Sequence, residues 1–215
     1  MSSPLKCPAS RPATLSPTMI EIPAGTTGLV FDCDGTLVDS MPLHTLLWDE
    51  CLVPFGVKLP TGFIDVHAGK PTDVIIDIIN VEHGVSINAL DFLDVKEGRF
   101  RARLGEVGAI EPVVEVARRY RGVLPMAVVS GGCRLNVVGA LEGIGALDWF
   151  DVILTADDPI KPKPAPDLFA TAAMMMGVEA KKCHAFEDAD AGIQAALGAG
   201  MTVTDVRIVL ASEAA

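Results

Sequence analysis

Two aspartates two residues apart, Asp32 and Asp34, directly follow a short apolar run in this chain of 215 residues. The run, residues 28–31, has the composition of a buried strand. In extended backbone, residues i and i+2 point to the same side, so both carboxylates face one side of the chain. Open α/β sheets bind ligands at the carboxyl ends of their strands. The spacing therefore predicts a pair of carboxylates in a binding crevice, and the alternative interpretation is a solvated Asp-Gly turn.

Two further segments carry groups that suit an anion. Ser130 and Gly131 end a second strand-like run and precede a helix-like window, where backbone amides and a hydroxyl form an anion site. The alternative is that Ser130 is an ordinary helix N-cap. Downstream, closely spaced prolines fix the backbone around Lys161 and Lys163, so that a lysine projects with little freedom. We select Lys163 of the two, and the alternative is a rigid surface loop.

A second acidic cluster, Glu187, Asp188 and Asp190, follows another strand-like run. Carboxylates gathered at one strand end repel one another unless a cation neutralises them. Mg²⁺ is the hard, oxygen-liganded cation that suits a phosphate site. We assign Asp190 instead to capping the helix that follows.

These groups require parallel strands to bring them together. Apolar runs at residues 124–129, 151–155, 183–186 and 202–206 alternate with helix-like windows at 132–144, 166–176 and 191–199. This alternation predicts an α/β fold with a doubly wound, parallel, Rossmann-like sheet. Residues 41–110 show helical periodicity and no convincing strand, which predicts an inserted all-helical cap domain. The predicted core is 25–40 with 111–215, preceded by a disordered Pro- and Ser-rich arm at 1–24.

Composition excludes several functions. The formal net charge is −11 and no basic runs occur, which argues against nucleic-acid binding. No apolar run approaches the roughly 18 residues that span a membrane. Five scattered cysteines without a paired spacing favour reduced thiols in the cytoplasm. The acid-poor arm leaves organelle targeting open as an alternative.

Taken together, the four segments resemble the signature motifs of the haloacid dehalogenase-like phosphohydrolases, over about residues 27–207. Asp-Cys-Asp-Gly-Thr-Leu, Ser130, Lys-Pro-Ala-Pro-Asp and Phe-Glu-Asp-Ala-Asp-Ala-Gly are similar to the beta-phosphoglucomutase-like branch. The last two motifs are most similar to bacterial fructose-1-phosphate and 6-phosphogluconate phosphatases. The resemblance implies a Mg²⁺-dependent phosphatase that acts on a small phosphorylated metabolite, and we expect a sugar phosphate.

The resemblance also implies roles for the residues. Asp32 would be the nucleophile that forms an aspartyl phosphate, and Asp34 the general acid and base. Ser130, the Gly131 amide and Lys163 would neutralise the phosphoryl oxygens. Mg²⁺ would be held by a set of ligands comprising Asp32, the main-chain carbonyl of Asp34, Asp188 and Glu187, the last directly or through water. Dehalogenases of this superfamily lack an acid at the second position, so Asp34 indicates phosphoryl transfer.

The predicted cap supplies two more candidates. His44 lies where the phosphoglucomutase-like group carries a histidine near the site, and the alternative is a helix-surface histidine. Lys70 lies in a segment that resembles the cap's specificity loop, and a solvated lysine is the alternative. Ala68 and Thr72 occupy positions where the mutases have Lys and Arg, which favours a monophosphate substrate. Trp48 is assigned to the core of the cap.

Two other functions are alternatives to a phosphatase. A sugar-phosphate mutase differs only in whether water or a second hydroxyl attacks the phosphoenzyme. A signalling receiver also combines a phospho-accepting Asp with a lysine, but its acidic pair comes early in the chain and it lacks a helical insertion. We expect a monomer with a small-molecule substrate, and neither nucleic-acid nor membrane partners.

Overall fold

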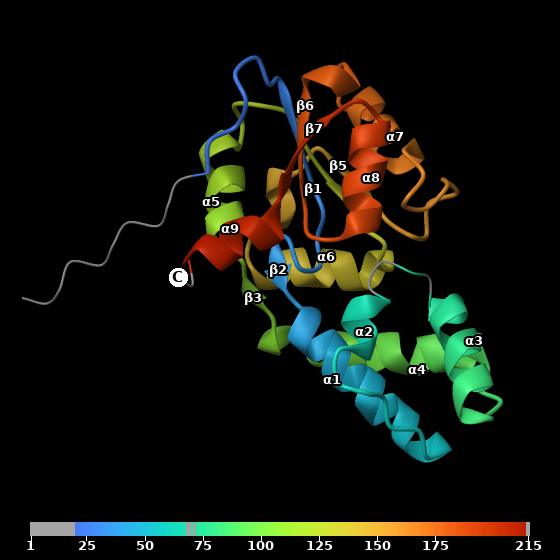
Figure 1. Ribbon diagram of the computed structural model, residues 1–215. Helices are drawn as coiled ribbons and strands as arrows, with labels where there is room; N and C mark the ends of the chain where they lie inside the picture. Colours follow the sequence, from blue (N-terminus) through green and yellow to red (C-terminus); the bar gives the residue numbers. More distant parts are fainter. Residues whose placement is uncertain (1–19, 68–69, 71, 214–215) are drawn as a thin grey trace, which may run out of the picture.

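A five-stranded parallel sheet organises the chain. The computed structural model describes residues 20–67, 70 and 72–213. The strands follow the order β5-β4-β1-β6-β7, so the strand that precedes Asp32 is central. Their bounds are Gly28–Phe31 (β1), Met126–Val129 (β4), Val152–Leu154 (β5), Cys183–Glu187 (β6) and Thr202–Asp205 (β7). This is the predicted α/β fold, and the chain path is visible in Figure 1.

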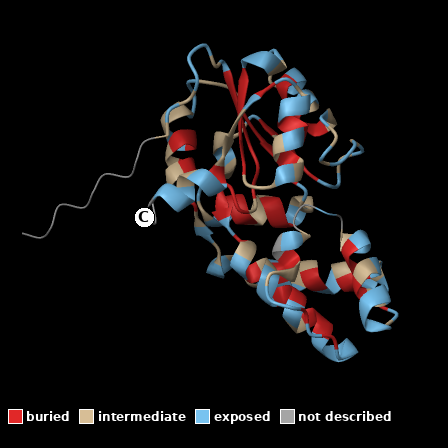
Figure 2. Ribbon diagram, viewed as in Figure 1, coloured by how far each residue is buried: buried red, intermediate tan, exposed pale blue. Residues whose placement is uncertain are grey.

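Helices cover both faces of the sheet. Their bounds are Glu111–Tyr120 (α5), Arg134–Gly143 (α6), Asp167–Met175 (α7), Asp190–Gly198 (α8) and Val206–Glu213 (α9). Side chains of β1 alternate between the two faces: Leu29 and Phe31 pack with α5 and α6, whereas Val30 packs with α7 and α8. Because every residue of β1 is buried, the strand reads as a continuous apolar run rather than an alternating one. Figure 2 shows the buried sheet between these helices.

The sequence located the strands but not their ends. The predicted runs 124–129 and 151–155 are shortened to β4 and β5, and the run 202–206 loses Val206, which begins α9. The residues trimmed from the two shortened runs are loop positions beside the strands. Beside β4 they are the apolar, half-buried Leu124 and Pro125, whereas beside β5 they are the polar Asp151 and Thr155. The helix-like windows match α6, α7 and α8 to within two residues at each end.

Four helices follow β1 in the chain and precede α5 and β4, namely Met41–Leu52 (α1), Phe63–Val66 (α2), Thr72–His83 (α3) and Ala89–Ala102 (α4). They enclose a hydrophobic cluster of their own that contains Trp48, Ile79 and Phe92, as expected for Trp48. In Figure 1 they form a layer below the sheet, and α6 lies between the two.

The junction of the insertion differs from expectation. We expected no strand between residues 41 and 110, but Gly108–Ala109 (β3) pairs antiparallel with Val38–Asp39 (β2). Two residues, one of them glycine, carry no alternating pattern, so the sequence gives no signal for such a ribbon. The ribbon joins the two chain connections to the helical insertion. The domain boundaries at 41 and 110 otherwise stay a prediction.

The predicted arm also ends earlier than expected. Residues 1–19 lie outside the described residues, but Ile20 and Ile22 pack against the core cluster beside α5. Arg119 donates a hydrogen bond to the Ile20 carbonyl at 2.8 Å. The sequence predicted a disordered arm up to residue 24. The packing of Ile20 and Ile22 against the core contradicts this prediction for residues 20–22.

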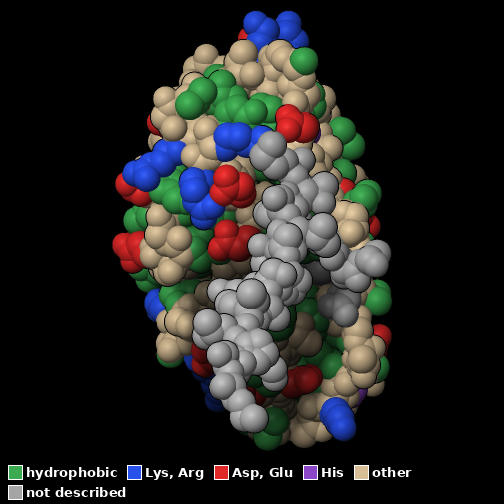
Figure 3. All heavy atoms as spheres, turned by 90° about the vertical axis from the view of Figure 1, so that its left-hand side faces the viewer, with side chains coloured by type: hydrophobic (Ala, Val, Ile, Leu, Met, Phe, Trp, Pro, Cys, Tyr) green, Lys and Arg blue, Asp and Glu red, His purple; other side chains and the backbone are tan. Residues whose placement is uncertain are grey.

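Charges of both signs are interspersed on the face that holds α5. Arg118 pairs with Glu111 and Glu115, and Arg121 pairs with Asp148. Figure 3 shows this face with red and blue side chains alternating. Within the described residues, no helix is both long enough and apolar enough to cross a bilayer.

The buried His184 on β6 should make the stability of the fold depend on pH. Its ring nitrogens lie 2.7 and 2.8 Å from the hydroxyls of Thr202 and Thr204 on β7. Burial lowers the pKa of the His184 imidazole to about 4. The unfolded chain, with an ordinary histidine pKa near 6.5, therefore binds this proton first as the pH falls. We predict that the free energy of unfolding falls by about 2–3 kcal/mol between pH 7 and pH 4 through this residue.

Urea unfolding of the wild type, His184→Gln and His83→Gln at pH 7 and pH 5 measures this effect. His184→Gln should lose part of the pH dependence even if it is less stable at pH 7. The exposed His83 on α3 is the control and should leave it unchanged. Equal pH dependence in all three proteins would refute the assignment.

Candidate active site

Asp32 lies at the carboxyl edge of the sheet, between residues supplied by its two neighbouring strands. Phe31 is in register with Val128 of β4 and Phe186 of β6, so the three strands end within one residue of each other. The Asp32 amide donates to the Phe186 carbonyl at 3.0 Å, which continues the ladder past the strand. The Asp32 carboxylate is buried. Parallel pairing thus brings together the motifs that the sequence separates.

Lys163 bridges two of the acids. Its Nζ lies 2.6 Å from Asp32 Oδ1 and 2.7 Å from Glu187 Oε2; both acids are buried, and the Lys163 side chain is 12% exposed. Burial disfavours the ammonium, but Asp32 and Glu187 outweigh this effect and raise the pKa of Lys163. The lysine is therefore charged, as a buried cation between two carboxylates should be. Lys163, and not Lys161, is the lysine that contacts the cluster.

One ammonium does not neutralise this site. Oxygen atoms of Asp32, Glu187 and Asp188 all lie within 4.8 Å of one another. Burial, followed by the charge of Glu187, raises the pKa of Asp32 well above its usual value and that of Asp188 to about 6. The excess negative charge and the all-oxygen donor set fit a hard divalent cation.

The backbone is shaped around Asp188. Gly35 has φ +83°, and a Cβ there would lie 2.3 Å from Asp188 Oδ2. The Thr36 hydroxyl donates to Asp188 Oδ1 at 2.9 Å. A glycine is thus required both by the turn and by the close approach of the carboxylate. Thr36 is a residue that our sequence analysis did not select, although it directly follows the Asp-Gly pair.

Asp34 occupies a different environment from Asp32. The Ser40 hydroxyl donates to Asp34 Oδ1 at 2.6 Å, and His44 Nε2 lies 3.4 Å from the same oxygen. Burial alone would raise the pKa of Asp34, but the hydrogen bonds from His44 and Ser40, together with the charge of Lys96, lower it. Its side chain lies outside the three-carboxylate cluster. Two acids two residues apart therefore have opposite pKa shifts, a feature of acid–base sites.

His44 belongs to α1 of the insertion and contacts the core carboxylate Asp34, which supports the interpretation that it is a site residue. Its ring stacks on Phe100 with centroids 4.2 Å apart. The buried Lys96 places its Nζ 3.4 Å from His44 Nδ1. Lys96 and Phe100 escaped the sequence analysis, because one charged and one aromatic residue on a helix do not reveal which face is covered.

Ser130 and Gly131, the residues after β4, do not cap the helix that follows, and their role as an anion site stays a prediction. Ser130 is buried, and its hydroxyl accepts a hydrogen bond from the Gly132 amide at 3.0 Å. The N-cap of α6 is Cys133, so the alternative that Ser130 caps this helix is wrong. Gly131 is exposed. Both residues lie at the same sheet edge as Asp32.

Lys70 is exposed, and its Nζ lies 2.8 Å from His67 Nδ1. Among the described residues it contacts none of the predicted site residues, and its role as a substrate contact stays a prediction. Its neighbours at positions 68, 69 and 71 lie outside the described residues. The assignment of Asp190 turned out differently. Asp190 does not cap α8: the N-cap is Ala189, and Asp190, in the first turn, instead accepts from Arg207 at 2.8 Å.

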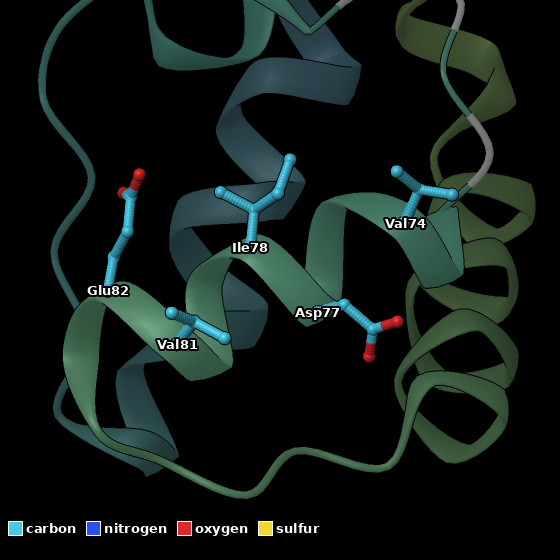
Figure 4. A pocket seen from close by; sticks show the side chains of 5 residues that line it. All are labelled: Val74, Asp77, Ile78, Val81 and Glu82. Carbon is cyan, nitrogen blue, oxygen red and sulfur yellow. The ribbon is translucent and has the colours of Figure 1, made fainter.

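A separate hollow of about 460 Å³ lies on α3 and is lined by Val74, Asp77, Ile78, Val81 and Glu82. All five side chains come from one helix, as Figure 4 shows. None of the predicted site residues lines it. The hollow is therefore separate from the predicted chemistry, which lies where the carboxylates and Lys163 meet.

The comparisons with known proteins identify the family. A family model described as a haloacid dehalogenase-like hydrolase matches residues 26–200. The fructose-1-phosphate phosphatase YqaB of Escherichia coli (strain K12) is 35% identical over 182 residues, which cover 85% of this chain and 97% of the relative. The 6-phosphogluconate phosphatase of the same organism is 33% identical and covers 80% of this chain and 79% of its own. The chain therefore belongs to the haloacid dehalogenase-like hydrolases and is an enzyme.

Solved structures agree. A haloacid dehalogenase hydrolase of family IA from Entamoeba histolytica matches with a TM-score of 0.73 and 26% identity, covering 83% of this chain and 82% of that one. A family member from Deinococcus radiodurans, solved with bound phosphate and sodium, has a TM-score of 0.65 and 31% identity over 84% of this chain and 80% of that one. The family resemblance predicted from the four motifs is confirmed.

Gly192 in the first turn of α8 offers a test of the acidic cluster. A Cβ there would lie 2.0 Å from Glu187 Oε2, so Gly192→Ala must displace the carboxylate from Lys163. We predict a loss of about 3 kcal/mol in the free energy of unfolding, as for other disrupted buried ion pairs. The control is Gly198→Ala in the same helix, where the new Cβ meets Pro166, with Cβ at 3.4 Å and Cγ at 3.8 Å. Chemical unfolding of both variants measures the difference, and equal stabilities would refute the geometry.

Proposed function

We propose that the protein is a Mg²⁺-dependent phosphatase that hydrolyses a small phosphorylated metabolite, a sugar phosphate, through an aspartyl-phosphate intermediate on Asp32. The observation that carries this proposal is the Lys163 ammonium held between Asp32 and Glu187. An anionic nucleophile approaches a phosphate dianion only when cations compensate the charge. Lys163 supplies one such cation at the carboxyl edge of the sheet.

In the proposed first step, an oxygen of Asp32 attacks phosphorus while the ester oxygen of the substrate leaves. Asp34, whose lowered pKa leaves it ionised in the free site, first takes up a proton from solvent and then delivers it to that leaving oxygen. Its hydrogen bonds to Ser40 and His44 hold the carboxyl in place. Lys163, Ser130 and the Gly131 amide bind the non-bridging oxygens. In the second step Asp34 accepts a proton from water, whose oxygen attacks phosphorus and releases Asp32 and inorganic phosphate.

Magnesium fits the cluster of Asp32, Glu187 and Asp188, and the Asp34 carbonyl is the proposed main-chain ligand. The three side chains offer only oxygen donors, with ligand atoms within 4.8 Å of one another. When bound, the ion would offset the charge that Lys163 leaves uncompensated and polarise the phosphoryl group.

The substrate class is proposed from the relatives. Two of them are named as phosphatases of a sugar phosphate and a sugar-acid phosphate. Residues 41–110 would act as a cap that excludes water, with His44 and Lys70 as candidate contacts. Lys70 is exposed and therefore free to reach a polar substrate.

We also propose that the protein works in the cytoplasm as a monomer, on a small molecule rather than on nucleic acid. Among the described residues four cysteines are unpaired, and Cys33, Cys51 and Cys183 are buried. Unpaired, buried thiols suit a reducing compartment.

Replacing the nucleophile tests the mechanism. Asp32→Asn should lower phosphate release from a panel of sugar phosphates by about 10³-fold or more, because an amide cannot form the acyl phosphate. The fold should persist, since the change removes one charge from a crowded acidic cluster. Asp190→Asn is the matched control, because this carboxylate pairs only with Arg207. Turnover retained by Asp32→Asn would contradict the assignment.

Metal removal tests the cofactor. Excess chelator should abolish activity, and Mg²⁺ should restore it while raising the unfolding temperature of the wild type by mass action. Asp188→Asn should lose that thermal shift, and Asp190→Asn should keep it. Full turnover in chelator would exclude Mg²⁺ dependence.

The same panel separates hydrolysis from the mutase alternative. Measured with and without a sugar bisphosphate activator, a phosphatase releases inorganic phosphate in either case. Isomerisation of a sugar phosphate without phosphate release would overturn the proposed function in favour of a mutase.

A further inference from the structure

We propose that Asn136, on the core helix α6, is a positioning residue that fixes α4 of the insertion so that Lys96 and His44 stay at Asp34. The proposal rests on the proposed function for its effect on turnover. Its structural part, a clamp between insertion and core, stands on contacts of this chain and can be tested without a substrate.

Asn136 uses both ends of its amide on α4. It is only 4% exposed. Its Nδ2 donates to Glu97 Oε2 at 2.5 Å and to the Glu97 carbonyl at 3.3 Å, and its Oδ1 accepts from Arg101 Nη1 at 3.2 Å. A buried amide that loses such partners is strongly disfavoured, so these bonds fix α4 at one position along α6.

Glu97 connects Asn136 to Lys96 through its two carboxylate oxygens. The second carboxylate oxygen, Glu97 Oε1, accepts from Lys96 Nζ at 2.8 Å. Lys96 is 5% exposed, and its ammonium lies 3.4 Å from His44 Nδ1. An ammonium only donates hydrogen bonds, so Nδ1 accepts and the ring proton lies on Nε2, which faces Asp34. The contacts therefore run from the core through the insertion and back to the proposed acid–base residue.

A second contact sets the same register. The next turn of α6 carries Gly139, where a Cβ would lie 2.6 Å from Leu104 Cδ1. Leu104 begins the short 3₁₀ helix Leu104–Glu106 that follows α4. Asn136 and Gly139 are three residues apart and share one face of α6. This face of α6 thus contacts the insertion twice, through the hydrogen bonds of Asn136 and, one turn later, through the close packing of Leu104 on Gly139.

The test removes the hydrogen bonds of Asn136 and measures both amide hydrogen exchange and phosphate release. Asn136→Ala should speed amide hydrogen exchange in α4 and in residues 104–106 about tenfold, because a hydrogen-bonded anchor to a charged group is lost. With the sugar-phosphate panel, kcat should fall about tenfold while KM changes less than threefold, since Asp34 loses its oriented partners. Arg101→Met removes only the hydrogen bond from the exposed Arg101 to Asn136 Oδ1. It should produce smaller changes in hydrogen exchange and in kcat, in the same direction.

The matched control is Asn80→Ala. Asn80 on α3 also makes two amide bonds, to the Ile87 backbone at 2.7 and 3.0 Å, but within the insertion. It should lose stability without altering exchange in α4 or the kinetic constants beyond twofold.

Unchanged exchange in α4 for both Asn136→Ala and Arg101→Met would overturn the clamp. An equal fall in kcat for Asn80→Ala would overturn the positioning role, because it would reflect general loosening. If the wild type releases no phosphate from the panel, the proposed function fails, and the exchange data still decide the clamp.

Discussion

The charge balance around Lys163 is the constraint on which the rest of the site depends. A buried ammonium is disfavoured unless carboxylates surround it, and here Asp32 and Glu187 do so at 2.6 and 2.7 Å. The same carboxylates, with Asp188, carry more negative charge than one lysine neutralises. That imbalance is the physical reason to expect a bound cation. It also explains why strands from both halves of the chain must end at one sheet edge.

Much of this edge could be predicted from residue types. The Asp-x-Asp-Gly segment, the lysine between prolines and the Glu-Asp pair each come after a strand-like run. Parallel pairing of those strands brings the three segments together. The side-chain contacts between the insertion and the core could not be predicted from the sequence. Lys96, Glu97 and Asn136 lie on helices separated by about forty residues of sequence, and only tertiary packing shows that they touch. Helix capping was misjudged at Asp190, because a polar residue near a helix start does not reveal its partner.

The insertion therefore has two relations to the core. Its apolar cluster around Trp48 and Phe92 is its own, whereas its polar contacts reach across to Asp34 and α6. A layer with its own apolar cluster, joined to the core partly through directed hydrogen bonds, suits the proposed role as a cap. We propose that its orientation depends on Asn136 and Leu104.

The central claim, that Asp32 carries the phosphoryl group, is tested most directly by trapping. Enzyme quenched during turnover of a sugar phosphate and treated with borohydride would have its acyl phosphate reduced to an alcohol. Peptide mapping by mass spectrometry then locates the modified residue. We predict homoserine at position 32 only, and none without substrate. Reduction at another carboxylate, or no reduction during steady phosphate release, would contradict the account.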